Sequence, residues 1–115
     1  MTSSIYLETS FISYLTGPPS PNLITAANQQ ITREWWDHRR LAFDLFISPL
    51  VIDEVSQGNA IQAAKRLAML DGLAILDTNN EVAELAVAFL QQVVPSKATD
   101  GAYHIAIATV YRINY

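Results

Sequence analysis

Short apolar runs alternate along the chain with longer segments in which apolar residues recur every three or four positions. Short runs bounded by turn-forming residues are typical of buried strands, whereas the longer period predicts amphipathic helices. The predicted strands cover residues 5–7, 43–48 and 73–76. The predicted helices begin near Phe11 and then cover residues 23–40, 51–56, 60–70, 81–94 and 99–111.

Strands that alternate with helices predict a parallel sheet with helices on both faces, which is a three-layer α/β sandwich. The 115 residues allow one domain with a single core, because two domains would each bury too little apolar surface. Half of the residues are apolar and only 16% are charged, as in a packed globular chain. Ligands of such sheets bind beyond the carboxyl ends of the strands, so acidic residues that follow strands become the candidates for a site.

Composition narrows the chemistry of any site. The sequence has no cysteine, which excludes disulfides and thiolate sites, so a metal ion would be bound by oxygen or imidazole. The net charge of -4 has the wrong sign for broad phosphate binding, although a few cations near a metal ion can hold one phosphate. The first residues lack a secretory signal, and no apolar stretch approaches the roughly 20 residues that span a bilayer. We therefore expect a cytoplasmic protein that does not contact a membrane.

The first candidate is Glu8, which directly follows the first predicted strand. Its carboxylate should project from the carboxyl end of that strand, where a ligand group would lie. Spacing alone favours a different role, in which Glu8 caps the helix that begins near Phe11. Thr9 and Ser10 leave the same choice open, since their hydroxyls can hold a ligand or water or can cap this helix.

Asp53 and Glu54 lie in the predicted helical turn that follows the second strand. Successive helix residues point about 100° apart, so one carboxylate should face the site and the other should face solvent. The neighbouring apolar residues do not decide between them. An exposed acidic turn would explain either residue taken alone.

Asp100 stands in the first turn of the last predicted helix, and His104 follows four residues later on the same face. Structural roles would account for both residues. An aspartate interacts well with the positive end of a helix, and a lone histidine in an apolar helix usually finds local hydrogen bonds. A role as ligands requires partners from other segments.

Three segments taken together resemble the successive acidic motifs of PIN domains, in particular those of VapC toxins of type II toxin-antitoxin systems. The segments are IYLETSFISYL (residues 5–15), SPLVIDEV (48–55) and KATDGAYHIA (97–106). Their order, their spacing and the helices between them carry the resemblance, which covers nearly the whole chain.

The resemblance implies a PIN-like sandwich and a metal-dependent endoribonuclease. In that family, acidic residues from the three motifs bind Mg²⁺ or Mn²⁺, which activates water for the hydrolysis of RNA phosphodiesters. The metal-binding and catalytic residues that it implies here are Glu8, Glu54 and Asp100, with Thr9, Ser10 and His104 as candidate supporting residues. A hard divalent cation would also offset the repulsion between clustered carboxylates. The family further implies an antitoxin peptide as a partner, bound in a groove between the early helices.

The sequence departs from the family pattern at two points. Most PIN domains have aspartate where Glu8 stands, and the longer side chain moves the carboxylate outward by about one bond. Relatives also continue beyond residues 113–115, which look like the start of a fourth strand, through that strand and a fifth. We therefore expect residues 1–115 to form a single, incomplete PIN-like domain that lacks its last two strands. Its first strand would be an unpaired apolar edge, which predicts a homodimer.

Two other functions remain open. A catalytically inactive, truncated PIN domain would serve only as an antitoxin-binding or self-associating module, and Leu15, Trp35 and Trp36 would then matter more than the acidic residues. The structural alternative for the two tryptophans places one in the core and the other at its rim. An unrelated nucleotide-binding α/β domain is disfavoured, because no glycine-rich loop follows the first strand.

Overall fold

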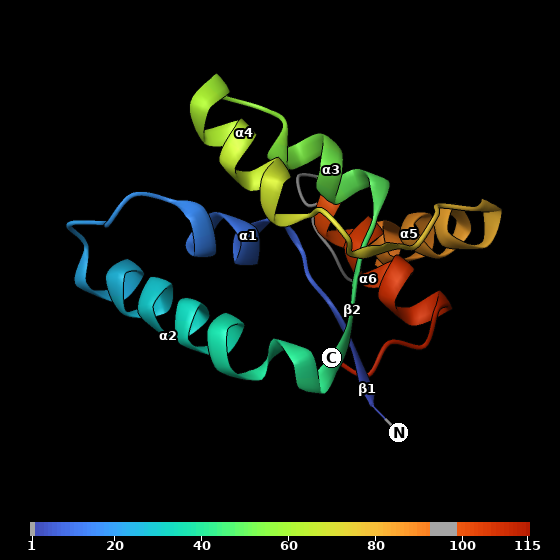
Figure 1. Ribbon diagram of the computed structural model, residues 1–115. Coiled ribbons are helices and arrows are strands. Elements are labelled where there is room, and N and C mark those ends of the chain that lie inside the picture. Colours follow the sequence, from blue (N-terminus) through green and yellow to red (C-terminus); the bar gives the residue numbers. More distant parts are fainter. Residues whose placement is uncertain (1, 93–98) are drawn as a thin grey trace.

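The computed structural model describes residues 2–92 and 99–115, and in these ranges it contains one sheet and six α-helices (Figure 1). The strands are β1 (Ser3–Tyr6), β2 (Phe43–Ile47) and β3 (Ala74–Ile75). The helices are α1 (Thr9–Thr16), α2 (Leu23–Arg39), α3 (Pro49–Val55), α4 (Ala60–Met69), α5 (Asn80–Gln92) and α6 (Thr99–Val110), with a short 3₁₀ helix at Arg40–Ala42. The predicted alternation is confirmed, while the predicted helix end at 93–94 lies outside the described residues. No helix within these described ranges has the length and apolar character needed to cross a membrane.

The three strands form one parallel sheet in the order β1-β2-β3, as the alternating pattern predicted. All four residues of β1 pair with β2, whereas β3 pairs with β2 only at Ala74 and Ile75. The pairing continues just past the strand ends, where the Leu76 amide donates to the Ile47 carbonyl at 2.8 Å. Because the strands are parallel, their carboxyl ends lie at one edge of the sheet, which we call the carboxyl edge.

Polar residues in front of the helices accept hydrogen bonds from free amides and so fix where the helices begin. Asn22 caps α2 and Asn59 caps α4 through their side-chain oxygens. Ser48 caps α3, whose first residue is Pro49, and proline suits this position because the first amides of a helix have no helical partner. The local sequence therefore fixes the turn from β2 into α3, which brings Glu54 to the carboxyl edge.

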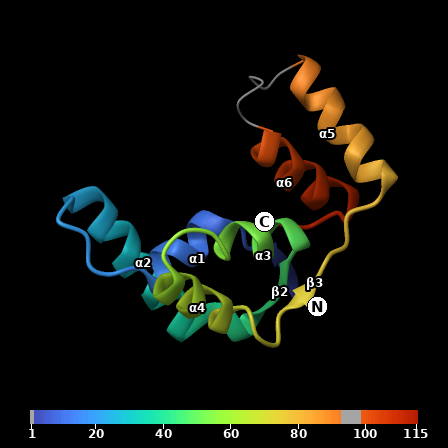
Figure 2. The same ribbon diagram turned by 90° about the horizontal axis from the view of Figure 1, so that it is seen from above.

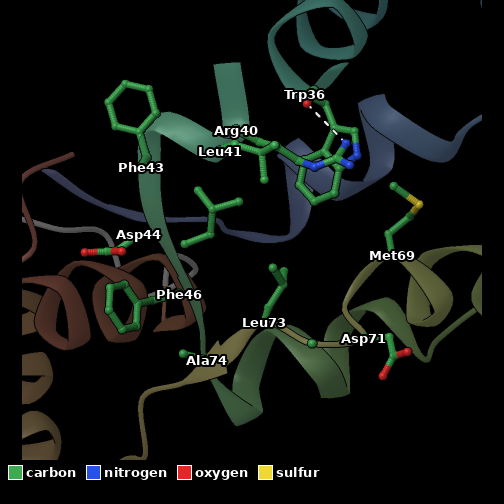
Figure 3. A pocket seen from close by; sticks show the side chains of 12 residues that line it. Trp36, Arg40, Leu41, Phe43, Asp44, Phe46, Met69, Asp71, Leu73 and Ala74 are labelled. Carbon is green, nitrogen blue, oxygen red and sulfur yellow. Dashed lines mark hydrogen bonds between the residues drawn. The ribbon is translucent and has the colours of Figure 1, made fainter. Parts of the chain in front are cut away.

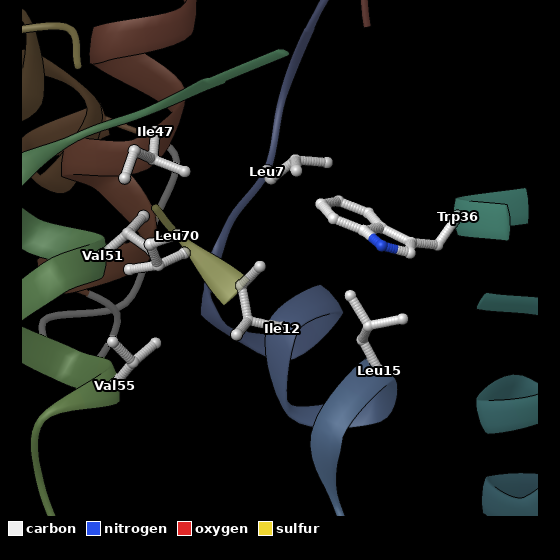
Figure 4. Packing of buried hydrophobic residues seen from close by; sticks show 8 residues of the cluster. All are labelled: Leu7, Ile12, Leu15, Trp36, Ile47, Val51, Val55 and Leu70. Carbon is white, nitrogen blue, oxygen red and sulfur yellow. The ribbon is translucent and has the colours of Figure 1, made fainter. Parts of the chain in front are cut away.

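One face of the sheet packs against the group formed by α1, α2, α3 and α4 through a cluster of buried apolar side chains (Figure 4). The buried members are Leu7, Ile12, Leu15, Trp36, Ile47, Val51, Val55 and Leu70. Trp36 lies within this core and Trp35 packs half-buried beside it, so one tryptophan is core and the other is at the rim. Leu15 and Trp36 are each only 9% exposed, which leaves neither side chain open to a partner.

Helices α5 and α6 pack against each other as a pair that stands beside the α1–α4 group (Figure 2). Their contact buries Val82, Ala86, Ala106 and Ile107. Leu85 and Phe89 of α5 lie partly buried at the same contact. Tyr6 of β1 packs against both apolar clusters and thereby joins the α5–α6 pair to the sheet.

The apolar stripe in the first half of α2 faces outward, although Trp35 and Trp36 near its end pack on the core. Leu23 and Ile31 are 86% and 64% exposed, and Ala27 between them is exposed as well. The polar side faces inward because it satisfies backbone groups of the preceding loop. Gln29 is buried and donates to the Pro18 carbonyl at 2.9 Å. A buried side-chain amide without partners costs free energy, so the bonds of Gln29 orient α2 and leave this apolar stripe outside.

Helix α4 likewise leaves apolar side chains exposed to solvent. Ile61 and Leu67 are 68% and 39% exposed, and Ala63 is the buried residue of the helix. Arg66 donates to the Val55 carbonyl at 3.0 Å, at the end of α3. The helical period therefore predicted correctly that both helices form. It does not show which side packs inward, because that side is set by polar side chains that bond to backbone carbonyls of neighbouring segments.

The outer edge of β1 is paired, contrary to the expectation of an unpaired apolar edge. The C-terminal residues run beside β1 (Figure 1). The Tyr6 amide donates to the Tyr115 carbonyl at 3.0 Å, and the Tyr115 amide donates to the Ser4 carbonyl at 3.1 Å. Asn114 Oδ1 accepts from the Ser4 amide at 2.8 Å. The expectation is wrong because the residues predicted to open a fourth strand already lie beside β1. The homodimer that this edge motivated stays a prediction.

Candidate functional site

The carboxyl edge brings together side chains from all three motif segments. Thr9 follows β1, Glu54 lies in α3 and His104 lies in α6. Thr9 Oγ1 donates to Glu54 Oε1 at 2.7 Å, and His104 Nε2 lies 2.7 Å from the same oxygen. Residues that are 45 and 50 positions away from Glu54 in the sequence therefore meet at one atom of its carboxylate.

Tyr6 and Ser48 extend this arrangement on the other side of the imidazole. The Tyr6 hydroxyl oxygen lies 2.6 Å from His104 Nδ1 and 2.7 Å from Ser48 Oγ. Both nitrogens of His104 are thus engaged, and no buried side-chain nitrogen or oxygen in the described part of the chain lacks a partner. We call this set the edge cluster: Tyr6, Thr9, Ser48, Glu54 and His104.

The edge cluster is mostly buried but remains partly accessible to solvent. The side chain of His104 is 11% exposed and that of Glu54 is 21% exposed. Burial raises the pKa of Tyr6 to about 12, the hydrogen bond with Ser48 opposes this shift, and the charges of Glu54 and Glu8 add to it. Tyr6 is therefore a neutral hydroxyl at neutral pH, and two carboxylates are close enough to influence it.

Glu8 caps α1, which is the structural role that its spacing favoured. Its Oε1 accepts from the Phe11 amide at 3.2 Å. Glu8 and Ser10 also line a hollow of about 370 Å³ between α1 and α2, where Ser10 is exposed. Of these three adjacent candidates, Thr9 contacts Glu54, whereas Glu8 and Ser10 face a different hollow.

Asp53 and Glu54 face different surroundings, as successive helix residues must. Glu54 belongs to the edge cluster, while Asp53 is exposed at a hollow of about 510 Å³ between α3 and the start of α6. Asp100 is exposed at the same hollow, together with Thr78 and Tyr103. The structure therefore resolves the choice that the sequence left open: Glu54 faces the cluster, and Asp100 shares a hollow with Asp53.

A Mg²⁺ or Mn²⁺ ion takes oxygen ligands from several side chains at once. Glu8, Glu54 and Asp100 have suitable chemistry, but across residues 2–92 and 99–115 no three acidic, histidine or cysteine side chains are grouped to hold a metal ion. Glu54 Oε1 already accepts from Thr9 and His104, and Asp100 faces another hollow. As they are arranged here, the three carboxylates do not fit a shared metal site.

Sequence reasoning missed the contribution of Tyr6 and Ser48. Tyr6 looks like an ordinary aromatic residue of a strand, and Ser48 looks like a helix cap before Pro49, which it is. The sequence nonetheless contained a signal for both residues, because each stands at or just past the carboxyl end of one of two neighbouring strands. Tyr6 pairs in register with Phe46, two residues before Ser48, so their side chains reach the same place.

Another hollow, of about 490 Å³, lies between β2, the end of α2 and the turn after α4 (Figure 3). The Arg40 guanidinium lies 4.9 Å from the centre of the Trp36 ring, and its Nη1 donates to the Trp36 carbonyl at 3.2 Å. These contacts hold the charge of Arg40 against its own helix end. None of the acidic candidates lines this hollow, so we place the candidate site at the carboxyl edge.

Comparison of the chain with protein family models, with curated proteins and with solved structures found no match. The fold is α/β with a small parallel sheet flanked by helices, which is compatible with a PIN-like sandwich. The resemblance to VapC toxins therefore rests on the three motif segments alone.

Proposed function

We propose that this chain is an endoribonuclease of the VapC type with a PIN-like sandwich, and that it hydrolyses RNA phosphodiesters at the carboxyl edge. The observation that carries the proposal is the convergence of the three motif segments on Glu54 Oε1. Segments that share one chemical task have to meet in space, and these meet where parallel sheets bind ligands.

Glu54 is the central acidic residue of this proposal. Its side chain is 21% exposed, so a substrate can reach it. Thr9 and His104 both contact Oε1 and hold the carboxylate in one orientation. A group that takes a proton from water or holds a ligand needs such a fixed orientation. Thr9 and His104 are therefore positioning residues for Glu54.

The proposal includes the Mg²⁺ or Mn²⁺ ion that the resemblance implies. Glu8 and Asp100 would supply further carboxylates, since Glu8 lies just past the end of β1 and Asp100 lines a hollow with Asp53 of α3. Both side chains would have to turn towards Glu54, because Glu8 caps α1 and Asp100 lines another hollow. Metal binding is therefore tested separately from cleavage.

Calorimetric titration with Mn²⁺ tests the metal, and cleavage of single-stranded RNA by the same samples tests the reaction. The variant is Asp100→Ala, and the matched control is Asp37→Ala, which removes an exposed carboxylate of α2. We expect the wild type and the control to bind Mn²⁺ and to cleave RNA, and Asp100→Ala to lose both. Metal-dependent cleavage that is unchanged in Asp100→Ala would contradict the proposal.

A second candidate function is a catalytically inactive module that binds an antitoxin peptide or a second copy of itself. The exposed apolar stripe of Leu23, Ala27 and Ile31 on α2 favours it, because contiguous apolar surface often marks an interaction site. Under this function Ile31→Glu should abolish association measured by analytical ultracentrifugation. Glu54→Gln should leave that association unchanged, and the wild type should not cleave RNA.

A further inference from the structure

The Tyr6 hydroxyl and Glu54 contact the same side chain, that of His104. The hydroxyl oxygen lies 2.6 Å from His104 Nδ1, and His104 Nε2 lies 2.7 Å from Glu54 Oε1. Tyr6 thus contacts the imidazole on one side while the carboxylate contacts it on the other. Nothing in the proposed chemistry uses Tyr6 directly, so its place in the cluster needs its own explanation.

The partners of His104 restrict where its hydrogen atoms can lie. An ionised carboxylate only accepts hydrogen bonds, so Nε2 carries the hydrogen that Glu54 accepts. In an imidazole that carries a single hydrogen, Nδ1 is then the acceptor, and the Tyr6 hydroxyl donates to it. The Tyr6 oxygen in turn accepts from the Ser48 hydroxyl, and the Ser48 oxygen accepts from the Val51 amide. One consistent direction of donation therefore runs from the first turn of α3 to Glu54.

We propose that Tyr6 is a positioning residue of the candidate site: its hydroxyl holds His104 in the Nε2–H tautomer and so aligns the hydrogen bond that His104 donates to Glu54. The effect of Tyr6 on RNA cleavage rests on the proposed function. The proposed tautomer of His104 does not rest on that function, because it is inferred from contacts of the imidazole that exist whether or not the protein cleaves RNA.

Packing holds the Tyr6 ring where this role requires it. The ring contacts both apolar clusters, and its centre lies 5.6 Å from that of the His104 ring. The hydroxyl is tied to Ser48 as well, so folding has already ordered the donor. Tyr6→Phe keeps the ring in both clusters and removes only the hydroxyl, which separates the hydrogen bond from the packing.

Long-range ¹H–¹⁵N NMR spectra of the full chain with labelled histidine measure the tautomer directly. The chain has two histidines, and exposed His38 on α2 is an internal reference. At neutral pH we expect wild-type His104 to show the well-separated nitrogen shifts of the Nε2–H tautomer, and His38 to show averaged shifts. In Tyr6→Phe the His104 shifts should move towards the average, while those of His38 stay unchanged.

RNA cleavage by the same samples supplies a second readout. Tyr6→Phe should slow cleavage on the order of tenfold, which is typical of losing a partner that orients an acting side chain. The matched control is Tyr115→Phe, whose ring is exposed and lies outside the edge cluster; it should change neither readout. A wild type that cleaves no RNA would contradict the proposed function and would leave the NMR result to decide the role of Tyr6.

Three outcomes would overturn the assignment: wild-type His104 in the Nδ1–H tautomer, wild-type His104 with both nitrogens protonated, or His104 shifts that are identical in the wild type and Tyr6→Phe. If Tyr6→Phe does not fold, the wild-type spectrum still decides the tautomer. Ser48→Ala is the second variant, because it removes the contact that orients the Tyr6 hydroxyl. It should move the His104 shifts in the same direction by a smaller amount, and unchanged shifts would count against the assignment.

Discussion

His104 Nε2 in α6 lies 2.7 Å from Glu54 Oε1 in α3, and this contact joins the α5–α6 pair to the rest of the fold. Tyr6 completes the link, since it contacts His104 and packs against both apolar clusters. The candidate site therefore lies at the seam between the two clusters. Substitutions in the edge cluster should affect the attachment of α6 as well as any chemistry.

The pH dependence of stability should report the buried Tyr6 hydroxyl. Its pKa is raised from 10.0 to about 12 in the folded protein, so the unfolded chain loses this proton at lower pH than the folded chain does. The contribution of Tyr6 to the free energy of unfolding should stay level below pH 10.0 and fall between pH 10.0 and about 12. Urea denaturation of the wild type and of Tyr6→Phe across this range measures the difference. If the free energies of unfolding of the two proteins differ by the same amount at every pH in this range, Tyr6 does not titrate in this way.

Much of the fold could be predicted because the chain marks the ends of its elements. Pro49 after Ser48 ends a strand and starts a helix, and Asp71-Gly72 ends another helix, where Gly72 adopts a positive φ of 81°. Once the elements alternate, the parallel sheet and its carboxyl edge follow. The position of Glu54 at that edge was therefore within reach of sequence reasoning.

The partners of Glu54 were not predictable in the same way. Asp100 and His104 lie on one helix face, and the helical period says nothing about what stands opposite each of them. The structure puts His104 against Glu54 and Asp100 beside another hollow. The outward orientation of the apolar stripe on α2 could not be predicted for a related reason, because Gln29 bonds to a loop carbonyl that only the fold brings close.

Trp36 and Ile31 should differ sharply in their effect on stability, although both lie on α2. Trp36 is 9% exposed within the core, so Trp36→Ala should lower the free energy of unfolding by about 3 to 5 kcal/mol. Ile31 is 64% exposed, so Ile31→Ser should change it by no more than about 0.5 kcal/mol. Chemical denaturation of both variants measures these values. Equal losses would mean that the outward stripe of α2 is buried in solution.

Asn114 should protect the outer edge of β1. Its Oδ1 accepts from the Ser4 amide at 2.8 Å and from the Ser4 hydroxyl at 3.0 Å. Asn114→Ala removes this single acceptor and leaves the Ser4 amide free to pair with another chain, while the backbone bonds of Tyr115 remain. Sedimentation velocity should therefore show more self-association than in the wild type or in the control Gln91→Ala, which alters an exposed residue of α5. Unchanged association would mean that Asn114 does not guard this edge.

The most direct test of a ribonuclease site at Glu54 is cleavage of single-stranded RNA by the wild type and by Glu54→Gln in the presence of Mn²⁺. Glutamine keeps the shape of the side chain and an oxygen for Thr9, but it removes the negative charge that the proposal requires. Glu84→Gln is the matched control, because Glu84 is exposed on α5. We predict equal cleavage by the wild type and Glu84→Gln, and a loss on the order of 100-fold or more in Glu54→Gln. Cleavage by Glu54→Gln at the wild-type rate, or none by the wild type, would contradict a ribonuclease site at Glu54.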